Sequence, residues 1–336
     1  MNKPLTTILT YLPGANKGLE KAGLSPLSLA MFILLAFAPL IIQDEYSLRL
    51  CVVSLLFGTL AMGFDLSAGF ISVANWGYAG LMGFGAYVSA LLLVKLGVSP
   101  WIGIFIGAFA VSLLGLLIGV LTLRMDGMFT GILAWFIGLT LMALAAGLQP
   151  LTRGSLGLNV PLFFDTPSTA PYFYTMLAIC FVTFIALRMI VRSHLGLAFK
   201  ALGQDAEAAK AAGVSPMKYR VINFTISCFI VGLCGGFYAH FIGILTPDLM
   251  KTRNCLEILV IAYIGGRGSI WGPLLAAFLI VPVFESMNSL LELKYIIYGL
   301  MLILVMIFYP KGFSGLWDNL VRVCKTKIKK EMEKFQ

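Results

Sequence analysis

Charged residues and histidine are scarce in this sequence. Only 12% of the 336 residues are Asp, Glu, Lys or Arg, and the two histidines are His194 and His240. Two histidines that lie far apart in the chain give no basis for a histidine-based metal or catalytic site. The phosphate-binding pattern G-x-x-x-x-G-K-[ST] is also missing, so no loop of this type can cradle a nucleotide here. We therefore expect no catalytic residue, no metal and no cofactor on this chain.

The six cysteines show no metal-ligand spacing. They are scattered along the chain, and most of them lie inside apolar runs, where a free cysteine behaves as a small packing residue. They stand at Cys51, Cys180, Cys228, Cys234, Cys255 and Cys324.

Apolar side chains, in contrast, are abundant. Hydrophobic residues make up 60% of the chain, which is more than a soluble domain of this length can bury. The apolar runs repeat near the ~20 residues that cross a bilayer, and backbone groups in lipid must pair within helices. The short alternating segments of a transmembrane β-barrel do not occur. The sequence predicts an all-α polytopic integral membrane protein with about eight to ten transmembrane helices.

We divide the chain into three regions. Residues 1–26 form an N-terminal segment, residues 27–309 a transmembrane domain, and residues 310–336 a basic tail. Within the domain, full spans are expected at about 27–42, 48–64, 78–96, 101–123, 128–148, 172–190, 219–244, 274–290 and 295–308, and a short or interrupted one at 256–264. Glycines at four-residue spacing in the fourth span predict close helix packing.

Two stretches are predicted to be broken or re-entrant. Residues 65–77 and 265–273 are moderately apolar and rich in glycine, and irregular backbone survives at membrane depth only when it is buried or lines a wet cavity. Asn75 and Tyr78 are candidates for lining the transport path, although they could instead cap helices or bond between them. Three glycines, Gly265, Gly266 and Gly268, could form an unwound gate or could let neighbouring helices pack closely, and the sequence favours neither interpretation.

The distribution of Lys and Arg predicts the orientation. With ten passes and both termini inside, most of the 24 basic residues face the cytoplasm, including those of residues 188–220 and the tail. Topology thus accounts for the net charge of +9, and we expect membrane lipid, not nucleic acid, around the chain.

Residues 193–218 form an unusually polar segment between two spans. Asp205 is expected to cap a short helix, Gly213 to take the left-handed position after it, and Pro216 to prevent its continuation. Four residues share one face at helical spacing, namely Leu202, Ala206, Ala209 and Gly213, and we expect this face to be nearly smooth and open to a partner. The segment is either a solvated linker or a docking helix for a soluble partner.

The pattern Glu207-Ala208-Ala209-x-x-x-Gly213 resembles the EAA loop of ABC importer permeases. Nearly the whole membrane domain is similar to the branched-chain amino acid permeases, the larger of their two transmembrane subunit types. Further matches follow in order: Tyr238-Ala239-His240, Thr246-Pro247-Asp248, Gly265-Gly266-x-Gly268-Ser269-x-Trp271-Gly272-Pro273, Tyr298-Gly299 and Tyr309-Pro310-Lys311-Gly312.

The resemblance implies a multi-pass protein of the bacterial inner membrane with both termini cytoplasmic. Its partners would be two ATP-binding subunits, a second permease subunit and a periplasmic substrate-binding protein. The helix over 205–213 would couple the ATPases to the permease, so that Asp205, Glu207, Ala208, Ala209 and Gly213 inherit this role. ATP hydrolysis is then expected on a separate chain.

At two positions the sequence differs from the family pattern, and these differences leave the identity of the solute undetermined. Tyr78 stands where the family usually has a histidine, and Leu156 stands where it usually has a polar residue. The solute could be a branched-chain amino acid, an amide, urea or another small polar molecule.

An ion-coupled secondary transporter is the alternative. Such a protein keeps carboxylates or paired charges inside the membrane. The predicted span interiors hold essentially none, with Asp65 and Asp126 at span ends and Glu285 and Glu292 at the interface. His240 is expected to be a satisfied polar residue near the end of a span.

Overall fold

In the computed structural model, residues 26–42, 44–122, 125, 127–164, 166, 168–287, 293–308, 312–313 and 315 are described. The predicted N-terminal segment and nearly all of the predicted tail lie outside these residues. The longer helices are α2 (Pro26–Ala36), α4 (Glu45–Ala68), α5 (Tyr78–Leu96), α6 (Pro100–Leu121), α7 (Gly127–Gly147), α9 (Ala170–Arg192), α10 (His194–Gln204), α12 (Pro216–Ile242), α13 (Thr252–Gly265), α14 (Trp271–Ser286) and α15 (Leu293–Phe308). The short elements are α3 (Ala38–Ile41), α8 (Gln149–Thr152), η3 (Gly154–Leu156), β1 (Leu158–Asn159), α11 (Ala206–Ala211), β2 (Ile244–Leu245) and η4 (Pro247–Met250).

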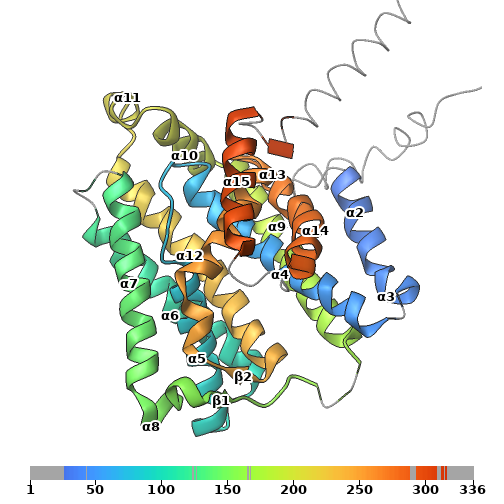
Figure 1. Ribbon diagram of the computed structural model, residues 1–336. Helices are drawn as coiled ribbons and strands as arrows, with labels where there is room; N and C mark the ends of the chain where they lie inside the picture. The colour runs from blue at the N-terminus through green and yellow to red at the C-terminus, as the bar shows by residue number, and fades with distance from the viewer. Residues whose placement is uncertain are drawn as a thin grey trace, which may run out of the picture.

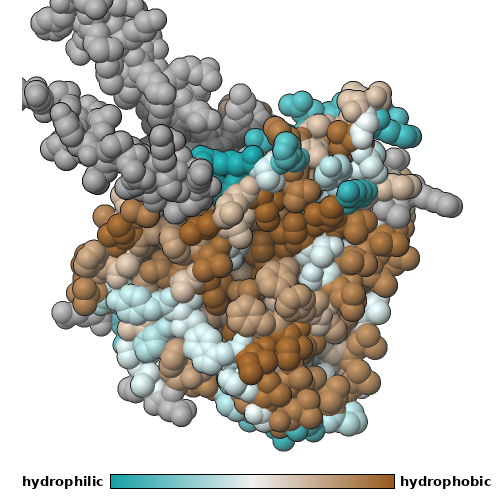
Figure 2. Space-filling view, turned by 180° about the vertical axis from the view of Figure 1, so that it is seen from behind, coloured by the Kyte–Doolittle hydropathy of each residue, from teal (hydrophilic) through white to brown (hydrophobic). Residues whose placement is uncertain are grey.

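The all-α polytopic fold is confirmed. Among the described residues, six helices are long and apolar enough to cross a bilayer, namely α4, α5, α6, α7, α9 and α12. Shorter apolar helices lie at Ser28–Ile41, Trp271–Ser286 and Ile296–Phe308. Figure 2 shows the consequence on one face of the molecule, where a broad apolar belt is bordered by polar side chains.

The first two spans differ from their predicted bounds. The run predicted as one span is divided into α2 and α3 at Phe37, because Pro39, in the first turn of α3, has no N–H to donate to the preceding turn. Conversely, α4 extends beyond its predicted end to Ala68. The Asp44 side chain caps its other end, and the hydrogen bonds from the hydroxyl and N–H of Ser47 lower the pKa of Asp44.

Glycine lets α12 lie in the middle of the bundle. A Cβ on Gly232 of α12 would meet Ala108 Cα of α6 at 2.8 Å, and one on Gly85 of α5 would meet Gly232 Cα at 2.9 Å. The predicted close packing of the glycines in α6 is confirmed, since a Cβ on Gly107 would lie 2.8 Å from the Gly85 carbonyl oxygen. Small residues therefore set the distance between these helices, as is typical inside membranes.

The two ends of the bundle carry different structures (Figure 1). At one end, β1 and β2 form an antiparallel ladder in which Leu158 pairs with Leu245, and α8 lies nearby. Helices α10 and α11 lie at the opposite end. The described backbone thus separates a loop-bearing end from an end with short polar helices.

Candidate functional site

A cavity of about 620 Å³ lies among six helices. Its walls come from α4, α5, α12, α13, α14 and the start of α15, together with η4 and its neighbours. The polar lining residues are Tyr46, Arg49, Tyr238, Arg253, Asn254, Glu257, Glu285 and Lys294. The apolar ones are Leu50, Val53, Phe57, Ala79, Met82, Ile242, Leu249, Ile258, Ile261, Val281 and Phe284. Both signs of charge therefore share one space with a large aliphatic and aromatic surface.

An ion pair crosses one side of this cavity. Lys294 Nζ of α15 lies 3.8 Å from Glu257 Oε1 of α13, and the two side chains are only 15% and 17% exposed. On α4, Arg49 places its guanidinium carbon 5.9 Å from the centre of the Phe241 ring. The pair is shielded from bulk water, which makes its electrostatic interaction stronger than that of a surface pair.

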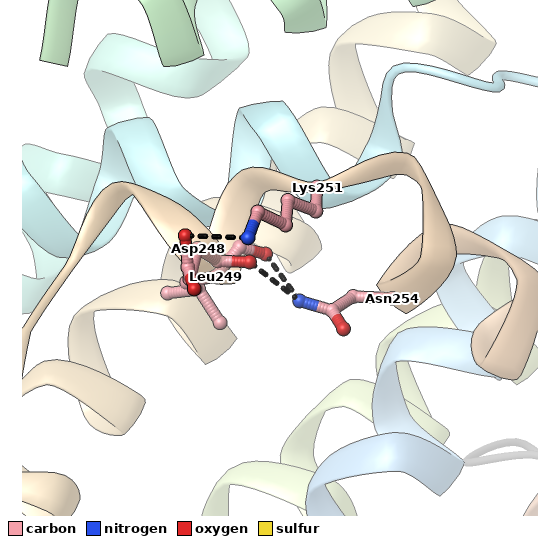
Figure 3. A network of polar contacts seen from close by, with 4 residues as sticks. All are labelled: Asp248, Leu249, Lys251 and Asn254. Carbon is pink, nitrogen blue, oxygen red and sulfur yellow. Dashed lines mark hydrogen bonds and ion pairs between the residues drawn. The ribbon is translucent and has the colours of Figure 1, made fainter. Parts of the chain in front are cut away.

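A small polar network fixes the cavity wall at the start of α13 (Figure 3). Asn254 Nδ2 donates to the carbonyl oxygens of Asp248 at 3.1 Å and Leu249 at 2.8 Å. Lys251 Nζ pairs with Asp248 Oδ1 at 2.8 Å, but both side chains are largely exposed. Trp135 Nε1 of α7 also donates to Thr252 Oγ1 at 2.8 Å. The two Asn254 bonds hold η4 against α13 and so position the cavity residues on both elements.

The cavity contains one carboxylate that our prediction left out, Glu257. Glu257 lies within α13, whereas Glu285 is exposed in the last turn of α14, which fits the expected interfacial position, and it also lines the cavity. Asp65 lies in the last turn of α4, where it is 2% exposed. Glu292 and Asp126 lie outside the described residues. Little in the sequence signals Glu257, because this residue stands at the edge of an apolar run, shortly after Arg253 and Asn254.

The structure does not bring Asn75 and Tyr78 into the cavity lining. Both are fully buried between helices. The Tyr78 hydroxyl lies 3.2 Å from both the carbonyl oxygen and the Oγ of Ser227 on α12. Asn75 Oδ1 accepts from the Gly77 N–H at 3.1 Å, and Asn75 Nδ2 lies 3.8 Å from Cys228 Sγ. This geometry fits the alternative given for Asn75 and Tyr78, in which their side chains form hydrogen bonds between helices and do not line a transport path.

The three predicted gate glycines form a tight connection between α13 and α14. Gly265 is packed against α14, where an added Cβ would lie 2.5 Å from Pro273 Cα. Gly266 and Gly268 have φ of 108° and 73°, in the region that glycine adopts without strain. The Gly268 N–H donates to Asp65 Oδ1 at 3.0 Å. The stretch is therefore both non-helical and closely packed.

The polar segment after α9 folds into two helices, α10 and α11. Asp205 caps α11 as predicted, since its Oδ1 accepts from the N–H groups of Glu207 at 2.9 Å and Ala208 at 3.0 Å. Gly213 has the predicted left-handed backbone, with φ of 85°. The Val214 N–H closes the end of α11 on the carbonyl oxygen of Ala209 at 3.0 Å.

The predicted smooth outer face is wrong in one respect. Leu202 belongs to α10, and both Leu202 and Ala209 are buried against the protein itself. The break before Asp205 turns the chain, so residues on either side of it do not continue one helical face. The residues of α11 that reach solvent include Glu207 and Ala208.

His240 is a satisfied polar residue, as expected. Its Nε2 lies 3.0 Å from Ser89 Oγ, and its Nδ1 lies 3.0 Å from the carbonyl oxygen of Pro161. Within the described part of the chain, no group of three or more His, Cys, Asp or Glu side chains could hold a metal ion.

The family model described as "Branched-chain amino acid transport system / permease component" matches residues 46–306. The chain is 26% identical over 314 residues to the high-affinity branched-chain amino acid transport system permease protein LivM of Escherichia coli (strain K12), covering 85% of this chain and 74% of LivM.

Two other relatives are also permease proteins. The chain is 24% identical over 282 residues to the high-affinity branched-chain amino acid transport system permease protein LivH of Salmonella typhimurium, covering 77% of this chain and 91% of LivH. It is 27% identical over 261 residues to the fructose import permease protein FrcC of Rhizobium meliloti, covering 73% of this chain and 69% of FrcC. No solved structure matches the chain significantly.

Proposed function

The chain belongs to the family of permease components of branched-chain amino acid transport systems, and we propose that its charged cavity carries a small amino acid across the membrane. As a multi-pass permease subunit of an ABC importer of the inner membrane, it works with other subunits. We also propose which solute it carries, which path the solute takes, which residues couple to ATP hydrolysis, and which subunits form the complex.

The lining of the cavity supports an amino acid as the solute. A zwitterion with an aliphatic side chain needs a cation for its carboxylate, an anion for its ammonium group and an apolar wall. Arg49 and Arg253 offer the first, Glu257 offers the second, and Ile258 and Val281 belong to the third. This combination in one space is the observation that carries the proposal, and it agrees with the names of the LivM and LivH relatives.

Helix α11 is the proposed contact with the ATP-binding subunits. It is short, capped at Asp205 and ended at Gly213, and it lies at one end of the bundle. A helix held at both ends can transmit force from a partner without unwinding. Glu207 and Ala208 face solvent and would make the contact, whereas Ala209 would anchor the helix to its own chain.

The proposed assembly contains two ATP-binding subunits, a second permease subunit and a periplasmic binding protein. The excess of Lys and Arg near α10, α11 and the tail supports the proposal that this end of the bundle and both termini face the cytoplasm. The opposite end, with β1, β2 and the loop that contains Arg153, would then face the binding protein.

The proposal is tested by uptake of labelled leucine into proteoliposomes that hold the complete importer. Arg253→Gln in the cavity should lower uptake about tenfold, the effect of removing one charged contact that is shielded from water. Lys251→Gln is the matched control, because Lys251 is two residues away and its side chain is 42% exposed. The binding protein stays unchanged in both variants.

Equal uptake by the Arg253 variant and the wild type would contradict the proposed path. Uptake of urea or fructose at a rate similar to leucine, by the same importer, would contradict the proposed solute while leaving the family unaffected.

A further inference from the structure

A second cavity, of about 680 Å³, opens at the end of the bundle that carries α10 and α11. Five parts of the chain meet there: Phe70 after α4, the last turns of α9, the middle of α10, the connection between α13 and α14, and Gly315. The lining residues are Phe70, Arg188, Val191, Arg192, Leu197, Lys200, Arg267, Gly268, Ser269, Ile270, Trp271 and Gly315.

Four basic side chains converge on this space. Arg188 and Arg192 are four residues apart on α9 and therefore lie on one face of that helix, Lys200 comes from α10, and Arg267 from the α13–α14 connection. No acidic residue of the described chain lines the cavity. Like charges brought together from separate elements repel one another unless an anion lies between them.

Aromatic rings and backbone hold three of these four cations in place, namely Arg188, Lys200 and Arg267. Lys200 Nζ lies 6.0 Å from the centre of the Phe70 ring, and the Arg188 guanidinium carbon lies 5.6 Å from that of Phe184. Arg267 stacks over Tyr263 at 5.4 Å, and its Nη2 donates to the carbonyl oxygen of Ala68 at 3.4 Å. Cation–π contacts orient a cation and leave its charge unneutralised.

An acidic group, Asp65, lies behind this connection, and its charge interacts with that of Arg267. It is buried, and its Oδ1 accepts from the Gly268 N–H at 3.0 Å, so it supports the loop from behind. Helix α14 begins at Trp271 with no side-chain cap, which adds the positive end of a 16-residue helix to the same cavity.

The rest of the lining is apolar. Phe70, Val191 and Ile270 contribute to it, and Leu197 is 63% exposed. A cavity with cations beside an exposed apolar side chain, at the boundary of the apolar belt, suits an amphipathic anion better than a fully hydrated one. Clusters of basic residues between membrane helices on the cytoplasmic side are typical of phospholipid headgroup sites.

We propose that this cavity binds a phosphate-bearing anion between Arg188, Arg192, Lys200 and Arg267. The phosphate can come from the headgroup of an anionic phospholipid or from a soluble phosphate. Binding links α9 and α10 to the connection between α13 and α14, and so ties the base of the proposed coupling helix to the bundle. This inference concerns the cavity alone and does not depend on which solute is transported.

Native mass spectrometry of the full chain in detergent tests the proposal. Phosphatidylglycerol is titrated in one arm, phosphatidylcholine in a second, and inorganic phosphate, alone and as a competitor, in a third. The double variant Arg188→Gln/Lys200→Gln should weaken binding about fivefold for each cation removed. Arg188→Lys/Lys200→Arg should retain it. The control is Lys95→Gln/Arg153→Asn, which removes two cations from residues outside this cavity, with Asn chosen because Arg153 has φ of 61°.

Selective binding of phosphatidylglycerol that phosphate does not displace would identify a lipid site. Saturable binding of phosphate, with displacement of the lipid, would identify a soluble anion, and either result supports the cavity. Equal affinity for both lipids with no binding of phosphate, or an equal loss in the control, would overturn the proposal. A loss of binding when the ATP-binding subunits assemble would also overturn it, because the cations would then face the partner protein.

Discussion

Lys294 of α15 lies 3.8 Å from Glu257 of α13, and this ion pair joins the last described helix to the wall of the larger cavity. Removing the charge of Glu257 should therefore affect both the cavity and the position of α15. We expect Glu257→Gln to lower leucine uptake by the reconstituted importer about tenfold, as for the loss of one partner in a partly buried pair.

The control for Glu257→Gln is Asp248→Asn, which breaks the exposed pair with Lys251. Its expected effect is close to zero, because surface ion pairs contribute about 0–1 kcal/mol to the free energy of unfolding. Equal loss of uptake in both variants, or no loss in either, would contradict the proposal that uptake depends on the Lys294–Glu257 pair.

Substitutions on the two faces of α11 should have different effects, one on coupling to ATP hydrolysis and the other on stability. Ala208→Leu adds a side chain to an exposed position and should separate ATP hydrolysis from uptake while the melting temperature of the subunit stays the same. Ala209→Leu adds it to a position that is 5% exposed, and overpacking there should cost about 1–3 kcal/mol of folding free energy. Thermal unfolding and ATPase activity of the same samples distinguish the two. Normal coupling in the Ala208 variant would remove the docking role from this face.

Close packing between α13 and α14 predicts that Gly265 cannot be enlarged. Gly265→Ala should lower the melting temperature, since the added Cβ would meet Pro273 and Gly272 of the next helix and overpacking costs about 1–3 kcal/mol. Gly299→Ala is the matched control, because no atom lies within 4 Å of an added Cβ there. A melting temperature of the Gly265 variant at or above that of the control would show that the connection is loose.

Tyr78 is predicted to be structural. Tyr78→Phe removes the hydroxyl that lies 3.2 Å from Ser227, and the expected cost is about 1 kcal/mol of stability. The KM for leucine should remain unchanged. An altered KM with an unchanged melting temperature would instead place Tyr78 in the transport path.

Much of the fold could be predicted from periodicity and composition. The bounds of α5 match the predicted span, and the caps of α11 at Asp205 and Gly213 follow from local rules that depend on few neighbours. The division at Phe37 could also have been read from Pro39, which was left inside a predicted span.

The cavity could not be derived in the same way. Its charges come from α4, α13, α14 and α15, which are far apart in the sequence, and only packing decides that Arg49 and Lys294 line the same space. The burial of Ala209 has a similar origin, because small side chains fit both an open surface and a close contact. Glu257 is a further case, since it stands at the start of an apolar run beside Arg253 and Asn254, where the sequence pattern is that of an interfacial residue.

The most direct test of the whole account is the energy source of uptake. The chain is reconstituted with its partner subunits, and leucine uptake is measured with ATP inside the proteoliposomes, with an ATPase-inactive partner, and with an ionophore. We predict that uptake requires ATP hydrolysis and is unaffected by the ionophore. Uptake that persists with the inactive ATPase and collapses with the ionophore would contradict the account and favour an ion-coupled transporter.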